Sequence, residues 1–130
     1  MLAIDGKIAL VTGATRGIGK AIALQLASQG AIVIGTATSL TGATAITDAL
    51  AEVGNAGTGM VLNVSDADSV ADTLKAIVET YGAPSILVNN AGITRDNLLM
   101  RMKNDEWDDV VNTNMSSIFR MAKGLSLIHI

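Results

Sequence analysis

The chain contains 130 residues, 49% of them apolar and 16% charged, a composition that predicts one soluble globular domain with a substantial core. Its net charge is −3 and no basic run occurs, so nucleic acid is not expected as a partner. Cysteine is absent, which excludes disulfides and thiolate chemistry, and neither a signal-peptide pattern nor an apolar run of about 18 residues is found. We therefore expect a cytoplasmic protein with no membrane partner and no metal site.

Short apolar runs alternate with helical patterns along the chain. The first run, "KIALVT" at 7–12, leads through a glycine turn into a helix that ends before Gly30. Apolar residues recur in this helix at Ile18, Ala21, Ile22 and Leu26. The later elements follow the same alternation. They are strands at 31–37, 57–64 and 85–92, and helices at 41–54, between Ser65 and Gly82, and at 104–123.

The helix after Ser65 has recognisable start and stop signals. Ser65 with Asp68 three residues later is expected to cap its beginning, and Gly82 and Pro84 are expected to end it. Five apolar or aromatic residues at helical spacing predict its buried stripe. They are Val70, Leu74, Ile77, Val78 and Tyr81.

The alternation of strands and helices predicts the fold class. The strands are apolar without a polar alternate face, which is typical of a parallel sheet covered on both sides by right-handed crossovers. We therefore expect an α/β, Rossmann-like doubly wound parallel sheet, truncated after about four strands and the helix that follows the fourth. Ligands of such sheets bind at the carboxyl ends of the strands.

The stretch "VTGATRGIG" at 11–19 carries three glycines between the first strand and the first helix. Residues without a Cβ adopt unusual backbone angles and let a phosphate approach the peptide groups. The helix that follows offers unpaired N–H groups and the positive end of its dipole, which favours a pyrophosphate. The alternative is that Gly13, Gly17 and Gly19 only make a tight turn and allow close packing of helix on strand.

The end of the second strand bears on which nucleotide is bound. An Asp or Glu there would hold the ribose 2′-hydroxyl of NAD, but "GTATSLTG" contains no acid and offers the hydroxyls of Thr36, Thr38 and Ser39. Arg16 in the glycine turn could place its guanidinium against a 2′-phosphate. The sequence therefore favours NADPH over NADH, although Arg16 could instead be a solvated turn residue.

A second motif, "NNAG" at 89–92, ends the fourth strand, and together with Thr12, Gly13, Gly17 and Gly19 it resembles the short-chain dehydrogenase/reductase superfamily. In that superfamily the first motif reads Thr-Gly-x-x-x-Gly-x-Gly. The segment "GITRDNLLMRM" narrows the resemblance to the bacterial 3-oxoacyl-[acyl-carrier-protein] reductases of type II fatty-acid synthesis. The resemblance covers residues from about 5 to 123.

This resemblance implies roles for individual residues. Residues of the glycine turn would line the pyrophosphate and the 2′-phosphate, Thr38 would lie near the adenosine ribose, and Asn63 and Val64 would flank the adenine. The implied turn residues are Gly13, Thr15, Arg16, Gly17, Ile18 and Gly19, and Asn90, Ala91 and Gly92 would support the nicotinamide ribose. An amide at the end of a buried strand can instead tie neighbouring strand ends together. That scaffold role competes with cofactor contact equally at Asn89 and less strongly at Asn90.

Asn114 lies in the middle of an apolar stripe. Trp107, Val111, Ile118 and Met121 surround it at helical spacing, so the amide should face the core and needs a defined partner. It could bond to its own helix. The resemblance implies instead that Asn114 belongs to a catalytic set with Ser, Tyr and Lys and holds a water in the proton relay.

The resemblance also implies residues that this chain does not contain. The family's Ser and its Tyr-x-x-x-Lys would follow the next strand, and the only tyrosine, Tyr81, is expected in the core. Gly124 is expected to interrupt the last helix, so we assign 1–123 to the N-terminal part of one reductase domain and expect 124–130, "GLSLIHI", to be an anomalous, non-native tail. His129 in that tail is not expected to be catalytic.

The expected function is the NADPH-dependent reduction of a 3-oxoacyl-[acyl-carrier-protein] thioester to the 3-hydroxyacyl form, as the family performs it. Without the Ser, Tyr and Lys, the chain alone is expected to be inactive. Two alternatives stay open: a nucleotide-binding module without catalysis, and another short-chain reductase, such as one acting on acetoacetyl-CoA. The resemblance implies a homotetramer for the intact family member.

Overall fold

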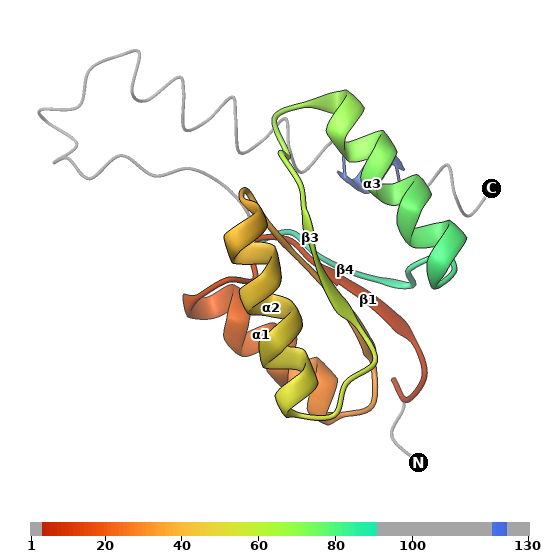
Figure 1. Ribbon diagram of the computed structural model, residues 1–130. Helices are drawn as coiled ribbons and strands as arrows, with labels where there is room; N and C mark the ends of the chain where they lie inside the picture. The colour runs from red at the N-terminus through yellow and green to blue at the C-terminus, as the bar shows by residue number, and fades with distance from the viewer. Residues whose placement is uncertain (1–3, 91–120, 125–130) are drawn as a thin grey trace, which may run out of the picture.

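The computed structural model describes residues 4–90 and 121–124, and its elements follow the predicted alternation (Figure 1). Each strand is a short run of apolar or β-branched residues and each helix follows a polar or glycine-containing turn. In chain order the elements are β1 (Ile8–Val11), α1 (Gly17–Ser28), β2 (Ile32–Ala37), α2 (Leu40–Glu52), β3 (Thr58–Val61), α3 (Ala67–Thr80) and β4 (Ile86–Val88).

The four strands form one parallel sheet with the spatial order β3-β2-β1-β4. In Figure 1, α1 and α2 lie on one side of this sheet and α3 lies on the other. A parallel sheet with crossover helices on both faces is the doubly wound arrangement predicted from the sequence, and that prediction is confirmed. The carboxyl ends of all four strands therefore lie at one edge of the sheet.

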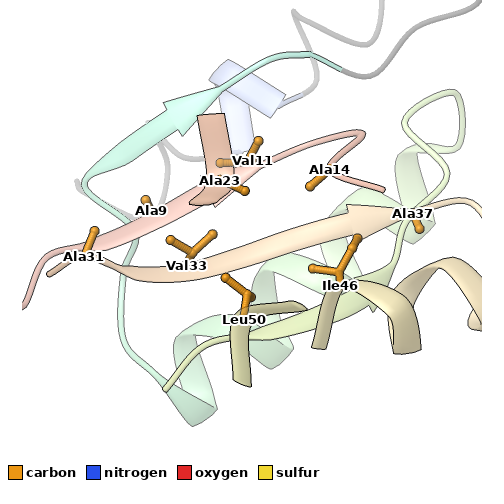
Figure 2. Close-up of a cluster of buried hydrophobic side chains, with 9 residues drawn as sticks. All are labelled: Ala9, Val11, Ala14, Ala23, Ala31, Val33, Ala37, Ile46 and Leu50. Atoms are coloured by element: carbon orange, nitrogen blue, oxygen red, sulfur yellow. The ribbon is translucent and has the colours of Figure 1, made fainter. Parts of the chain in front are cut away.

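Alternate residues of the central strands face the two sides of the sheet and fill two separate clusters of apolar side chains. Ala9 and Val11 of β1 belong to the cluster beneath α1 and α2, which Figure 2 shows together with Ile46 and Leu50 of α2. Leu10 belongs to the other cluster, beneath α3. The helices on both faces are thus held by burial of apolar area, the main stabilising contribution to the fold.

Helix α2 packs closely on the sheet at two glycines. A Cβ on Gly59 of β3 would collide with the carbonyl oxygen of Ala43, and one on Gly42 would come within 2.7 Å of Ala37 Cβ. Thr47 Oγ1 accepts a hydrogen bond from Gly59 N at 2.9 Å, which joins the helix to the strand directly. The absence of a side chain at Gly59 therefore allows the backbone of α2 to approach the sheet closely.

Two details of α1 and α3 differ from the predictions. Ile18 is 74% exposed and Ala21 is exposed, because α1 turns Gly19 and Ala23 toward the sheet instead. In α3, Val78 is 37% exposed and lies outside the buried stripe of Val70, Leu74 and Ile77. In both helices, fewer of the apolar residues at helical spacing are buried against the sheet than the sequence predicts.

The predicted cap of α3 is wrong by one residue. Asp66, not Ser65, is the N-cap, and its carboxylate accepts hydrogen bonds from the backbone N–H groups of Asp68 and Ser69. Ser65 lies in the turn before the helix, where its N–H donates to Asn63 Oδ1 at 3.0 Å. This bond forms an Asx turn that precedes the cap at Asp66.

Residues 121–124 are helical and lie against α3. Met121 is 1% exposed and belongs to the cluster beneath α3. Gly124 continues this helical segment instead of interrupting it, contrary to the prediction, and a Cβ there would meet the flexible end of the Leu74 side chain.

Asn55, in the turn between α2 and β3, makes three hydrogen bonds across the amino-terminal edge of the sheet. Its Oδ1 accepts from Val33 N at 3.2 Å and Gly57 N at 3.0 Å, and its Nδ2 donates to Ala31 O at 2.7 Å. We expect Asn55→Ala to lower the free energy of unfolding by about 2 kcal/mol, since buried backbone groups lose their partners. Urea unfolding measures this change. Ser28→Ala, which removes one exposed hydrogen bond to Gln25 O, is the control and is expected to change stability by less than about 0.5 kcal/mol.

No helix in the described part of the chain combines the length and the apolar character needed to cross a membrane.

Candidate functional site

The glycine turn joins β1 to α1 at the carboxyl edge of the sheet. Gly13 and Gly17 have φ angles of 65° and 60°, a backbone conformation that other residues rarely adopt. No atom lies within 4 Å of the position that a Cβ of Gly17 would occupy, so conformation and not space requires glycine there. Two of the three glycines are thus needed to reverse the chain between strand and helix.

The peptide groups of Gly13 are held from both neighbouring strands. Its N–H donates to Thr36 Oγ1 at 3.3 Å, and its carbonyl oxygen accepts from Asn90 Nδ2 at 3.0 Å. The next N–H, that of Ala14, donates to the Thr36 carbonyl at 3.0 Å. Because these groups are already hydrogen-bonded, Gly13 contributes the shape of the turn.

Asn90 follows β4 and ties this strand to the end of β1. Its backbone N–H donates to Thr12 Oγ1 at 3.0 Å, and Thr12 Oγ1 in turn donates to Val88 O at 3.4 Å. With the side-chain bond to Gly13, Asn90 has the scaffold role that the sequence left as the weaker alternative at this position. A contact between Asn90 and a cofactor stays a prediction.

Gly19 lies where α1 approaches this scaffold. A Cβ at residue 19 would collide with the Gly13 carbonyl oxygen and with Asn90 Nδ2. Gly19 therefore allows the first turn of α1 to pack directly on the hydrogen bond between Gly13 and Asn90. The alternative predicted for the glycines, close packing of helix on strand, is therefore confirmed at Gly19.

The amino end of α1 is open to an anion. Arg16 is the N-cap residue with an extended backbone, and its side chain makes no capping hydrogen bond. Residues 15–18 are exposed, so the N–H groups at the start of the helix face solvent beside the positive end of the helix dipole. This geometry can bind a phosphate through backbone N–H groups.

The charge around the turn has the same sign as the helix dipole. Residues 6–47 contain no Asp or Glu, although the whole chain has a net charge of −3. Of the three cations in this range, Arg16 and Lys20 lie at the turn, and Lys7 precedes β1 at the opposite edge. Arg16 and Lys20 are both exposed, and they lie one helical turn apart at the start of α1. The carboxyl edge near α1 is thus suited to an anionic ligand.

The three hydroxyl residues at the end of β2 differ in what their side chains bind, and only one of them is exposed without a hydrogen bond to the backbone. Thr36 is 1% exposed and holds Gly13, and Ser39 caps α2 by accepting from Gly42 N at 3.1 Å. Thr38 is exposed between them. A Cβ on Gly42 would lie 3.3 Å from Thr15 Oγ1, so the start of α2 and the glycine turn are neighbours. Thr38 and Arg16 consequently belong to adjacent loops of one edge.

Asn63 and Val64 follow β3 at the same edge. Asn63 is exposed, its N–H donates to Ser69 Oγ at 3.1 Å, and its Oδ1 holds the turn into α3. Val64 is partly buried and packs against the apolar cluster beneath α3. The structure brings both to the edge that carries the glycine turn, while their predicted contact with adenine stays untested.

Several predicted site residues lie outside the described residues. These are Ala91, Gly92 and Asn114. Tyr81 is described: it follows α3, packs against the cluster beneath that helix, and precedes Ser85, whose N–H donates to Ile8 O at the start of β1. Tyr81 therefore lies near the amino end of β1, away from the glycine turn, as predicted.

Sequence reasoning missed the roles of Thr36 and Asn55. A threonine in the otherwise apolar strand "AIVIGTA" was a signal, because a buried hydroxyl requires a partner. It was interpreted as a group facing the ribose. No comparable signal was present for Asn55, whose distant partners are Val33 of β2 and Ala31 just before that strand.

The sequence matches one protein family and several named reductases. The pattern of the family described as short chain dehydrogenase matches residues 7–127. A 3-oxoacyl-[acyl-carrier-protein] reductase of Pseudomonas aeruginosa is 59% identical over 124 residues, which cover 95% of this chain and 50% of the relative. The reductases of the same name from Vibrio harveyi and Escherichia coli (strain K12) are 61% and 60% identical, over 94% and 93% of this chain and 49% and 48% of their own lengths.

The chain spans about half the length of the curated relatives that it matches. The family pattern covers nearly all of its residues, and the parallel sheet with its glycine turn agrees with that match. This chain therefore belongs to the short-chain dehydrogenase family.

Proposed function

We propose that this chain is the nucleotide-binding part of an NADPH-dependent 3-oxoacyl-[acyl-carrier-protein] reductase of fatty-acid synthesis. The observation that carries the proposal is the open amino end of α1, with Arg16 exposed at its N-cap, in a chain about 60% identical to reductases of that name. The substrate would be a 3-oxoacyl thioester on acyl carrier protein. When bound, NADPH would supply the hydride that reduces the 3-keto carbon.

The described residues fit such a nucleotide. The N–H groups of Gly17, Ile18 and Gly19 would bind the pyrophosphate, because they begin a helix that has no side-chain cap. Arg16 would bind the 2′-phosphate as a charged fork, with Thr15 beside it in the same turn and Thr38 on the adjacent loop. Asn63 and Val64 would flank the adenine, and Gly13 and Asn90 would fix the turn.

Roles for the residues outside the described ranges rest on the family resemblance. Ala91 and Gly92 would support the nicotinamide ribose together with the described Asn90, and Asn114 would hold the water of the proton relay. The assignment of 1–123 to the reductase domain and of 124–130 to a separate tail, the homotetramer of the whole protein and its cytoplasmic location remain proposals of the same kind.

Substituting Arg16 tests the cofactor assignment. We expect Arg16→Ala to weaken NADPH binding about tenfold and to leave NADH binding within about twofold, because only NADPH carries the 2′-phosphate that the guanidinium would pair with. Titration of each nucleotide, followed by calorimetry, measures both affinities. Lys20→Ala removes a cation one helical turn away and is the matched control.

An unchanged ratio of NADPH to NADH affinity in Arg16→Ala would contradict the role of Arg16. Saturable NADPH binding without turnover of acetoacetyl thioester is the outcome expected for this chain, since its only tyrosine lies away from the turn. Thioester reduction by the chain would show that a different proton donor exists. Failure to bind either nucleotide would contradict the proposal itself.

A further inference from the structure

Thr36 is a buried hydroxyl that the nucleotide-binding scheme above does not use. It is 1% exposed and lies near the end of β2, opposite the point where β1 enters the glycine turn. Its Oγ1 accepts the Gly13 N–H at 3.3 Å, and its carbonyl accepts the Ala14 N–H at 3.0 Å. A single residue thus fixes two consecutive peptide groups of the turn from the neighbouring strand.

We propose that Thr36 is a positioning residue for the nucleotide pyrophosphate, acting through Gly13; this inference rests on the proposed function. Gly13 has a φ of 65° and is the first residue of the turn, so its orientation sets the path of the chain toward Gly17. With the Thr36 hydroxyl in place, the Gly13 N–H is turned toward β2 and away from a ligand. The N–H groups at the start of α1 are then the ones presented to phosphate.

The Thr36 hydroxyl and the Asn90 side chain hold Gly13 from opposite neighbouring strands. Asn90 Nδ2 donates to the Gly13 carbonyl from the end of β4, so the peptide groups of Gly13 are held by β2 and β4 together. Without Thr36 Oγ1, the Gly13 N–H would lose its partner in a partly buried position, and the turn would be held only by the Asn90 bond and by the backbone bond from Ala14 N to Thr36 O. Thr36 acts on the part of the site that NADPH and NADH share, whereas Arg16 acts on the 2′-phosphate.

Thr36→Val and Thr36→Ser separate this role from a purely structural one. Valine keeps the branched shape but removes the hydroxyl, and serine keeps the hydroxyl. We expect Thr36→Val to weaken NADPH and NADH binding equally, by about tenfold, and to raise the hydrogen-exchange rate of the Gly13 amide, measured by NMR. We expect Thr36→Ser to bind both nucleotides within about twofold of the unmodified chain.

Each outcome of these titrations decides a specific point. If fully folded Thr36→Val bound the nucleotides as tightly as the unmodified chain, or more tightly, the inference would be overturned. A loss of affinity for NADPH alone would overturn it as well. Unchanged exchange at the Gly13 amide would show that Thr36 does not hold the turn, whether or not nucleotide is bound. If the unmodified chain bound neither nucleotide, the proposed function would fail, and the pyrophosphate role of Thr36 would fail with it.

Discussion

Gly19→Ala is expected to cost about 3 kcal/mol of folding free energy and to weaken NADPH binding more than tenfold in the molecules that remain folded. The added Cβ would collide with the Gly13 carbonyl oxygen and with Asn90 Nδ2. Alanine is the better helix former by about 1 kcal/mol, but overpacking against a fixed backbone costs about 1–3 kcal/mol and the hydrogen bond between these groups is lost as well. Urea unfolding and NADPH titration measure the two effects.

Gly59→Ala is the matched control for this substitution. Its Cβ would collide with another backbone carbonyl oxygen, that of Ala43, at the contact between β3 and α2. We expect a similar loss of stability and an unchanged NADPH affinity once the folded fraction is taken into account. Gly19→Ala with the affinity of the unmodified chain would show that the packing of α1 on the turn does not shape the nucleotide site.

Asn90→Asp is expected to weaken NADPH binding about a hundredfold. The substitution replaces the amide that donates to the Gly13 carbonyl with a carboxylate, which repels that oxygen and any phosphate bound at the turn. The backbone bond from residue 90 to Thr12 Oγ1 is retained, so the strand ends should stay paired. Because the repulsion is electrostatic, the loss should be smaller at 0.5 M salt than at 0.05 M, and titration at both concentrations measures the difference.

Asn89→Asp introduces the same charge at the exposed neighbouring residue and serves as the control. We expect it to weaken binding less than about threefold, with a similar salt dependence. Equal losses in the two variants would mean that net charge at this edge, and not the hydrogen bond to Gly13, determines the effect.

The arrangement of strands and helices was predictable because local pattern determines it. Apolar runs without a polar alternate face indicated a buried parallel sheet, and the glycines marked where the chain leaves β1. The faces of the helices were predicted less well. Ile18 fits a helical stripe by spacing, but the close approach at Gly19 rotates α1 so that Ile18 is exposed.

Contacts between distant residues account for what the sequence could not show. The cap of α3 is Asp66, and Asn63 holds the N–H of Ser65 in the turn before it, whereas the sequence is compatible with a cap at either Ser65 or Asp66. The hydrogen bond from Gly13 N to Thr36 joins residues 23 positions apart, and that from Asn90 to Gly13 joins residues 77 positions apart. Which hydroxyl or amide faces a ligand and which holds the backbone depends on such pairings.

The close seating of α2 on the sheet bears on how a nucleotide is selected. Gly42 lies against Ala37 Cβ and its N–H donates to Ser39 Oγ at 3.1 Å, so the start of α2 is held close to the end of β2. The loop that carries Thr38 runs from β2 directly into this part of the helix. The site that discriminates between nucleotides would then be preorganised, and binding would cost little conformational entropy. A poorly matched nucleotide would be distinguished by faster dissociation instead of slower association.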